Sequence, residues 1–437
     1  MKRARGFARP AAVTVIGSGL PSKRCVTQQC TPPERMRRAA RCQRAVIVPR
    51  VHDERMNPLT ALTLDELRYR RSIKWCQYEP DVLPLWVAEM DTPLAEPIAD
   101  ALAALVGRGD TGYAHIAGLA EAYAGFAADR LGWVPDPARA MLMPDVMNGI
   151  VAVLRVLTAP GDGVAVTPPV YHPFFSFIAN ADRRVVEVPL LPEAPRLDLA
   201  GLERVFASRE ARVCLLCNPH NPTGDVFSRD VLLEVARLAD RHGVRLLVDE
   251  IHAPLTYPGA TAVPMLSLVD DVEAAARAFV FVSASKAWNL PGLKAALVFA
   301  GPAAAEDLGA VPHEVTFGAG LPGVVASEAA LRHGVPWLDE LVAGLDSNRR
   351  LLAELLAEYL PDVGYRLPDA TYLAWLDCRA LGLGDDPAVE FLERGRVAVY
   401  SGPMFGEDGR GFVRLNFATS PEILREGVRR MAAATNR

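Results

Sequence analysis

Long apolar runs are missing from this chain of 437 residues, and no run approaches the roughly 20 residues that a membrane span requires. The formal net charge of −5 gives no indication of a nucleic acid or a membrane surface as partner. Half of the residues are hydrophobic and 23% are charged, which is ordinary for a globular protein. We therefore expect a soluble protein that is long enough for one large domain and a smaller one.

Cysteine is also scarce, and the 7 cysteines are scattered along the chain, which is not the pattern of a disulfide framework. Cys214 and Cys217 form a C-x-x-C pair, but no second pair follows at a zinc-like spacing. Both lie in the apolar run Val213–Cys217, which predicts a buried strand. We interpret them as buried structural thiols without a metal, and we expect the reducing environment of the cytoplasm.

Residues 1–55 differ from the rest, because they contain 13 Lys or Arg and 3 Asp or Glu, a net charge of +10. Their apolar stretch Ala11–Leu20 is interrupted by Gly17-Ser18-Gly19, which makes a poor signal peptide and an incomplete dinucleotide loop. We interpret residues 1–55 as a disordered or artefactual extension before a protein that starts near Met56. A transit peptide is the alternative.

Residues 140–300 alternate helices with short apolar strands, which is typical of a largely parallel α/β sheet. After about residue 320 the pattern changes to one that predicts a smaller α+β domain. We expect residues 56–105 to contribute to this small domain, residues 106–325 to form a large ligand-binding domain, and residues 326–437 to form the rest of the small one. The expected strands are Val164–Thr167, Arg184–Val188, Val213–Cys217, Val244–Val248, Phe279–Val282, Thr371–Trp375, Val397–Tyr400 and Val413–Asn416. The expected helices are Pro97–Val106, Gly149–Leu157, Asp230–Arg241, the long stretch Pro322–Leu360, and Pro421–Ala433.

The segment Ser283-Ala284-Ser285-Lys286 follows an apolar strand. A lysine at a strand end can form a Schiff base with a cofactor aldehyde, while neighbouring hydroxyls bind a phosphate. Lys294 supplies a second positive charge for such a phosphate. Alone, this segment is also typical of a polar surface loop.

Asp249 and His252 follow the strand Val244–Val248, and ligands of α/β sheets bind beyond the carboxyl ends of strands. A carboxylate there could keep a pyridinium nitrogen protonated. Asp249 could equally cap the next helix. His252 could reach the phenolic oxygen of the same ring or be an ordinary packed histidine.

Two further segments follow predicted strands. Asn218–Gly224 reads N-P-H-N-P-T-G, a rigid turn that would present the Asn221 amide to the same edge of the sheet. Tyr171 comes after Thr167-Pro168-Pro169 and could stack on a flat ring, although a core tyrosine in a turn is the more common case when this motif is taken alone.

Together and in this order, the motifs resemble the fold type I enzymes of the aminotransferase class I/II superfamily, which depend on pyridoxal 5′-phosphate (PLP). They resemble most closely its branch of cystathionine β-lyases, or cysteine C–S lyases, which includes the maltose-regulon modulator. The resemblance covers about residues 65–435 and implies a mostly parallel seven-stranded sheet in the large, PLP-binding domain. The segments that carry it are Ser72–Trp75, Leu83–Asp91, Gly112-Tyr113, Asn218–Gly224, Ser283–Asn289, Thr371–Asp377 and Phe412–Asn416.

The resemblance also implies roles for single residues. Lys286 holds PLP and later moves the substrate proton, Asp249 pairs with the pyridinium nitrogen, and Asn221 donates to the ring hydroxyl. Tyr171 stacks on the ring. The implied phosphate ligands are the backbone N–H groups of Val146 and Met147 at a helix N-terminus, together with Ser283, Ser285 and Lys294.

The substrate side is implied in the same way. Arg414 resembles the arginine that clamps the α-carboxylate of the substrate, and Trp86 is assigned to the substrate site. Tyr113 resembles a tyrosine that reaches the phosphate of a partner subunit, which implies a homodimer with shared active sites.

The chain departs from the resembled pattern at several positions. Asp145 stands where a glycine is expected before the phosphate loop, and its carboxylate is unfavourable there unless the side chain points away. The other departures are Glu89 for aspartate, Thr92 for phenylalanine, Trp288 for a smaller side chain, and Asp369-Ala370 where glycine is favoured. These changes bear on the size of the substrate more than on the cofactor.

Two reactions are open once Lys286 has removed the Cα proton. Elimination of a thiolate from Cβ gives thiol, pyruvate and ammonia, so our first hypothesis is a β-lyase acting on cystathionine, cystine or another cysteine S-conjugate. Return of the proton at C4′ gives an aminotransferase, our second hypothesis, because both reactions use the same residues. A regulatory role through a bound partner is a third class, but the intact Lys286, Asp249 and Arg414 argue against a scaffold without activity.

Overall fold

The computed structural model describes residues 57–116, 118–191 and 196–435. The extension predicted for residues 1–55 lies outside the described residues, and the predicted domain boundaries stay predictions. Within the described part of the chain, no helix is both long and apolar enough to cross a membrane.

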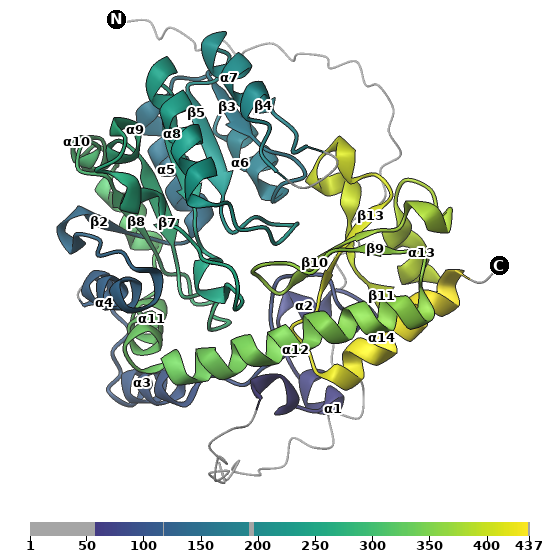
Figure 1. Cartoon of the computed structure of the whole chain (residues 1–437). Coiled ribbons are helices and arrows are strands. Elements are labelled where there is room, and N and C mark those ends of the chain that lie inside the picture. Colours follow the sequence, from purple (N-terminus) through teal and green to yellow (C-terminus); the bar gives the residue numbers. More distant parts are fainter. Residues whose placement is uncertain (1–56, 117, 192–195, 436–437) are drawn as a thin grey trace, which may run out of the picture. The chain divides into compact units, whose positions relative to one another are not determined.

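The larger sheet has 7 strands in the order β2-β8-β7-β6-β5-β3-β4 (Figure 1). The strands from β7 to β4 are parallel neighbours, whereas β8 runs antiparallel to both β2 and β7. This confirms the predicted α/β fold with a mostly parallel seven-stranded sheet. The strands are β2 (Ala140–Met143), β3 (Gly163–Val166), β4 (Arg184–Glu187), β5 (Val213–Cys217), β6 (Arg245–Asp249), β7 (Phe279–Val282) and β8 (Ala296–Ala300).

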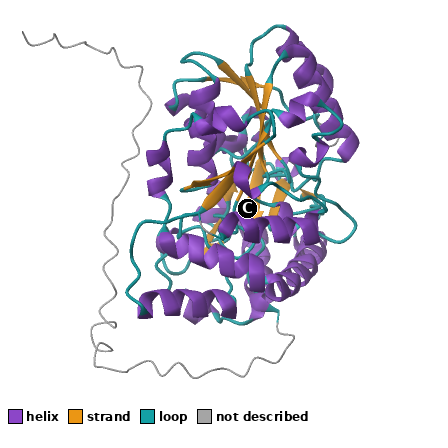
Figure 2. Cartoon of the chain, turned by 90° about the vertical axis from the view of Figure 1, so that its left-hand side faces the viewer, coloured by secondary structure: helices purple, strands orange, loops and turns teal. Residues whose placement is uncertain are grey.

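Side chains of the central strands enter two apolar cores, one on each face of the sheet. In β5, Cys214 and Leu216 belong to one core, and Leu215 and Cys217 to the other, as the two-residue period of a strand requires. Helices cover both faces (Figure 2), which explains why these strands are continuously apolar. One core contains residues of α5 (Val146–Leu157), α6 (Pro173–Asn180) and α10 (Ala305–Gly309). The other contains residues of α3 (Glu96–Gly107), α4 (Leu119–Leu131), α7 (Leu199–Ala207), α8 (Arg229–His242), α9 (Glu273–Ala276) and α11 (Leu321–His333).

A smaller antiparallel sheet of 4 strands has the order β12-β13-β10-β9. Beside it, β1 and β11 form a parallel pair, which ties the N-terminal segment to the C-terminal part of the chain. These strands are β1 (Leu83–Pro84), β9 (Gly364–Tyr365), β10 (Leu373–Asp377), β11 (Val397–Ala398), β12 (Tyr400–Ser401) and β13 (Phe412–Asn416). The remaining helices are α1 (Leu64–Leu67), α2 (Ile73–Cys76), α12 (Val335–Tyr359), α13 (Pro387–Glu393) and α14 (Pro421–Thr435).

Two predicted elements are wrong in detail. The stretch Pro322–Leu360 is two helices, α11 and α12, because Gly334 ends the first and a proline stands in the first turn of the second, where its missing N–H costs nothing. The predicted strand Val397–Tyr400 is split between β11 and β12, which pair with different strands. The sequence prediction also missed β2 and β8.

Candidate active site

A cavity of about 250 Å³ lies at the carboxyl ends of β5 and β6, where the N-terminus of α5 and the segment after β7 also meet. This is the edge of a parallel sheet at which ligands bind. The predicted residues that line it are Val146, Met147, Tyr171, Asn221, Asp249, His252, Ser285, Lys286 and Lys294. Segments that are far apart in the sequence therefore meet as the motifs predicted.

Asp249 is the last residue of β6 and is buried, with 3% of its surface exposed. It points to the α5 side of the sheet because Leu247, two residues earlier, belongs to the core on that side. Its Oδ1 accepts a hydrogen bond from the Ile251 N–H at 3.1 Å. Burial raises the pKa of Asp249 to about 7. A carboxyl group of this kind gains from a cationic partner in the cavity.

The neighbouring Glu250 does not line the cavity, because successive side chains of an extended segment face opposite ways. It is buried, and its Oε1 accepts a hydrogen bond from the Met265 N–H at 2.7 Å. Burial raises the pKa of Glu250 to about 8. The alternation of side chains thus directs Asp249, and not Glu250, into the cavity.

Lys286 lies after β7, and its Nζ donates a hydrogen bond to the Ala88 carbonyl at 3.1 Å. Burial, together with the nearby positive charge of Arg414, lowers the pKa of Lys286 to about 8. A sizeable fraction of its amine is therefore neutral near pH 8. A neutral amine is the form that acts as a nucleophile or as a base.

The turn after β5 holds Asn221 at the same edge. Gly224 ends this turn at a φ of 74°, and a Cβ there would lie 2.3 Å from the Pro368 side chain, so only glycine fits. Asn221 is buried, and its Oδ1 accepts a hydrogen bond from Arg414 Nη1 at 3.0 Å. The amide nitrogen of Asn221 is therefore the group left to donate to a ligand.

Arg414, in the middle of β13, is a buried cation with 1% of its surface exposed. Its Nη2 donates to the Trp86 carbonyl at 3.2 Å, and its guanidinium lies 4.7 Å from the Tyr400 ring centre and 5.0 Å from that of Phe405. Its Nε has no partner among the described residues. A buried cation without an anionic partner is costly, so a ligand carboxylate would satisfy it.

The helix α5 starts at Val146, three residues before the predicted Gly149, because Asp145 caps it: its Oδ1 accepts from the Asn148 N–H at 2.9 Å. Asp145 also lines the cavity, and its Oδ2 lies 3.0 Å from Lys294 Nζ. The Asp145 side chain therefore does not point away from the expected phosphate site. Its carboxylate partly neutralises Lys294, which we predicted to be a phosphate ligand.

Four predicted residues lie outside the cavity lining: Ser283, Tyr113, Trp86 and Arg414, of which Arg414 is hydrogen-bonded to the lining residue Asn221. The Ser283 hydroxyl donates to the Ala295 carbonyl at 2.6 Å and accepts from the Ser285 N–H at 3.1 Å, so it holds the turn together. Tyr113 is 85% exposed. Trp86 is buried beside Tyr400, and its backbone carbonyl accepts a hydrogen bond from Arg414. Their assigned roles stay predictions.

Sequence reasoning missed residues that pack around Arg414. His172 lies 4.9 Å from the Tyr400 ring centre and 5.4 Å from that of Phe405, the two rings that flank the guanidinium. Burial, together with the charge of Arg414, lowers the pKa of His172 to about 4. No spacing signal links His172, Tyr400 and Phe405, because they come from different segments.

Residues 73–431 match the sequence family described as aminotransferase class I and II. The chain belongs to this family. Among its relatives, a Mycobacterium tuberculosis protein provisionally named cystathionine beta-lyase is 49% identical over 86% of this chain and 98% of its own. The cystathionine beta-lyase of Corynebacterium glutamicum is 36% identical over 85% of this chain and 98% of its own. A Corynebacterium diphtheriae crystal structure, provisionally described as a PLP-dependent beta-cystathionase, superposes with a TM-score of 0.81 at 37% identity, covering 86% and 98% of the two chains.

Proposed function

We propose that this chain catalyses the PLP-dependent β-elimination of cysteine S-conjugates, as a cystathionine β-lyase does. The observation that carries the proposal is the cavity lined by Lys286, a lysine of lowered pKa, and by the buried carboxyl group of Asp249. The buried cation Arg414 is hydrogen-bonded to Asn221, another residue of that lining. The relatives named cystathionine beta-lyase, which align over nearly their whole length, favour the same reaction.

The cavity fits PLP in polarity as well as in position. Its buried end carries Asp249, which suits a cationic ring nitrogen, and its exposed rim carries Lys294 and the N-terminus of α5, which suit a phosphate. His252 Nδ1 is a buried polar atom without a partner among the described residues, and a ring substituent would satisfy it. We propose that Lys286 holds the cofactor, that Tyr171 covers its ring, and that Asn221 donates to its hydroxyl.

When bound, PLP supplies an aldehyde that condenses with amines and a ring that takes up electron density from Cα. The side chains bind the substrate and move its protons. Arg414 binds the α-carboxylate and fixes Cα next to Lys286, whose neutral amine removes the Cα proton. Asp249 keeps a proton on the ring nitrogen. The electron pair of the broken Cα–H bond then expels the thiolate from Cβ, and water converts the remaining three-carbon fragment to pyruvate and ammonia.

Transamination is the second candidate, because the matched family is that of aminotransferases and the same residues serve both reactions. The test is incubation of the purified holoenzyme with L-cystathionine, with and without a 2-oxo acid. Elimination yields homocysteine and pyruvate in equal amounts without an acceptor. If product forms only when the 2-oxo acid is present, and the 2-oxo acid is converted to the corresponding amino acid, the lyase proposal is overturned and the protein is a transaminase.

We also propose a homodimer in which Tyr113 contacts the partner's site. Tyr113 and Phe317 are 85% and 57% exposed, with ring centres 5.8 Å apart, and such aromatic pairs are often covered by a partner. Tyr113→Ala should weaken the dimer or the binding of PLP, whereas Val134→Ala, at another exposed apolar position, should not. Sedimentation measures the dimer, and titration with PLP measures cofactor binding.

We also propose a cytoplasmic location, since Cys214 and Cys217 are free, buried thiols.

A further inference from the structure

The segment Trp86–Thr92, which we call the strap, belongs to no helix or strand. Five successive carbonyls in it accept hydrogen bonds from side chains elsewhere in the chain. The donors are Arg414 to Trp86 at 3.2 Å, Asn416 to Val87 at 2.7 Å, Lys286 and Tyr372 to Ala88 at 3.1 and 3.0 Å, Lys74 and Asn416 to Glu89 at 3.1 and 2.6 Å, and Asn289 and Arg70 to Met90 at 2.8 and 3.0 Å. Most backbone carbonyls pair with other backbone groups, so this concentration of side-chain donors is unusual.

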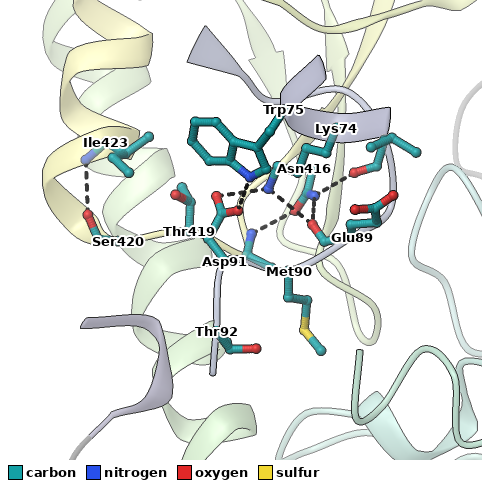
Figure 3. Close-up of polar contacts among 12 residues, drawn as sticks. Lys74, Trp75, Glu89, Met90, Asp91, Thr92, Asn416, Thr419, Ser420 and Ile423 are labelled. Atoms are coloured by element: carbon teal, nitrogen blue, oxygen red, sulfur yellow. Dashed lines mark hydrogen bonds and ion pairs between the residues drawn. The ribbon is translucent and has the colours of Figure 1, made fainter. Parts of the chain in front are cut away.

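The strap is anchored at its C-terminal end by a buried ion pair (Figure 3). Lys74 Nζ lies 2.8 Å from Asp91 Oδ2, and both side chains are 1% exposed. Asp91 Oδ1 also accepts from Trp75 Nε1 at 3.1 Å, and the Asp91 N–H donates to the Ala418 carbonyl at 2.9 Å. Breaking one half of such a buried pair is strongly destabilising, so the anchor holds the strap in one position.

The strap touches the two groups on which the proposed reaction depends. Its Ala88 carbonyl binds the amine of Lys286, from the segment after β7 of the larger sheet, and its Trp86 carbonyl binds the guanidinium of Arg414, from the smaller sheet. The two carbonyls are two residues apart, so a displacement of one moves the other. We propose that the strap is a positioning element that sets Lys286 relative to Arg414, with Tyr372 and the Lys74–Asp91 pair as its positioning residues. This inference rests on the proposed function for the roles of Lys286 and Arg414.

Tyr372 acts through the Ala88 carbonyl. A carbonyl oxygen has two acceptor positions, and the Tyr372 hydroxyl, buried in the core, fills one of them. The other accepts from Lys286. Once released from the cofactor, the amine of Lys286 can donate one N–H to Ala88 and keep its lone pair for the Cα proton.

The first test is Tyr372→Phe, which removes one hydroxyl and leaves the ring in place. The matched control is Tyr365→Phe, whose hydroxyl bonds to the Arg349 carbonyl at 3.3 Å, away from the strap. We expect kcat for L-cystathionine to fall about 10-fold with KM unchanged, and the isotope effect of Cα-deuterated substrate to rise. A fall in kcat equal to that of Tyr365→Phe, or an unchanged isotope effect, would overturn the role of Tyr372.

The second test removes both charges of the anchor together, as Lys74→Met with Asp91→Asn, so that no unpaired buried charge remains and Trp75 keeps an acceptor. The control is Arg245→Met with Asp307→Asn, which removes another ion pair of 2.8 Å, remote from the strap. In the holoenzyme we expect the amides of residues 89–91 to exchange hydrogen at least about 10-fold faster, with the melting temperature lowered no more than in the control. Unchanged exchange of these amides refutes the anchor.

A substrate without a leaving group separates the two proposals. L-alanine needs Arg414 and the cofactor but has no thiolate on Cβ, so its binding can be followed as a change in the visible spectrum. The anchor variant should bind L-alanine at least about 10-fold more weakly than the control variant. If the wild-type protein binds L-alanine but releases no thiol from L-cystathionine, and the anchor variant still binds L-alanine more weakly than the control variant, the proposed lyase activity is wrong and the positioning role of the strap is supported. If both variants bind it equally, the strap fails whatever the reaction.

Discussion

The two halves of the site are built in different ways. At the edge of the seven-stranded sheet, Asp249 ends a buried strand, Asn221 and Lys286 follow the carboxyl ends of two others, and all three present a side chain to the cavity. On the other side, Arg414 stands in the middle of β13, and the strap contributes backbone carbonyls. In the proposed reaction, the first half supplies reactive groups and the second half binds and positions the substrate.

This difference predicts how variants should divide. Changes at the sheet edge should reduce kcat or the retention of cofactor, because those groups touch the reacting atoms in the proposed reaction. Changes at Arg414 should act mainly on KM, because in the proposed reaction Arg414 binds a part of the substrate that does not react. Changes to the strap's contact with Lys286 should act on kcat instead.

The largest effect is expected from Lys286→Ala. It removes both the covalent link to the cofactor and the base, so elimination should fall at least about 1,000-fold and the visible absorbance of the lysine-bound cofactor should vanish. Lys294→Ala, at the rim, is the control and should keep that absorbance while weakening cofactor binding. If Lys286→Ala keeps the band unchanged, the central assignment is wrong.

Asp249→Asn should come next. Asparagine keeps the size of the side chain but cannot stabilise a cationic ring nitrogen, so we expect kcat to fall about 100-fold or more with little change in KM. Glu250→Gln next to it should leave kcat within about two-fold, because Glu250 lies outside the cavity lining. Equal losses in the two variants would contradict the division of roles. Steady-state kinetics gives kcat and KM for both variants.

Arg414→Lys tests the other half. A lysine cannot provide the two parallel donors that match a carboxylate, so KM for L-cystathionine should rise about 10- to 100-fold, with a smaller effect on kcat. Arg366→Lys, at a partly exposed ion pair with Asp225, is the control. A loss confined to kcat would show that Arg414 does not bind the substrate carboxylate.

A smaller effect of opposite sign is expected from Asp145→Asn. Asparagine also caps helices well, but it no longer competes with a phosphate for Lys294, so the dissociation constant of PLP should fall about 3- to 10-fold. Equilibrium titration measures it. The control is Asp136→Asn, which changes another capping aspartate at an exposed site. Weaker PLP binding in Asp145→Asn would show that the carboxylate supports the phosphate site.

The smallest effect concerns stability. Burial raises the pKa of Glu250 to about 8, above its ordinary value of 4.5, so the folded protein holds this proton more tightly than the unfolded chain. The resulting stability is fully present below about pH 4.5 and is lost as the pH rises through about 8. Glu250→Gln should therefore flatten the decline of the melting temperature between about pH 5 and 9, by roughly a few degrees. Glu328→Gln, at an exposed ion pair, should not.

Much of the sheet-edge half could be predicted, because its signals are local. Apolar runs gave β5 and β7 at their observed limits, and the polar residues that follow them turned out to line one cavity. The short strands β2 and β8 were missed, since β8 directly follows the candidate lysine segment and β2 pairs only with β8, which is more than a hundred residues away. The break at Gly334 was missed because helical periodicity continues on both sides of it.

The sequence by itself determined the fold class, the order of the motifs and the chemical types of the residues that reach the cavity. These depend on strand and helix periods and on turn residues, which act over a few positions. Only the tertiary structure decided that Asp145 pairs with Lys294, that Glu250 turns away, and that the strap's carbonyls bind Lys286 and Arg414. Those contacts join residues separated by 149 to 328 positions, and backbone carbonyls, present at every residue, leave no mark in a sequence.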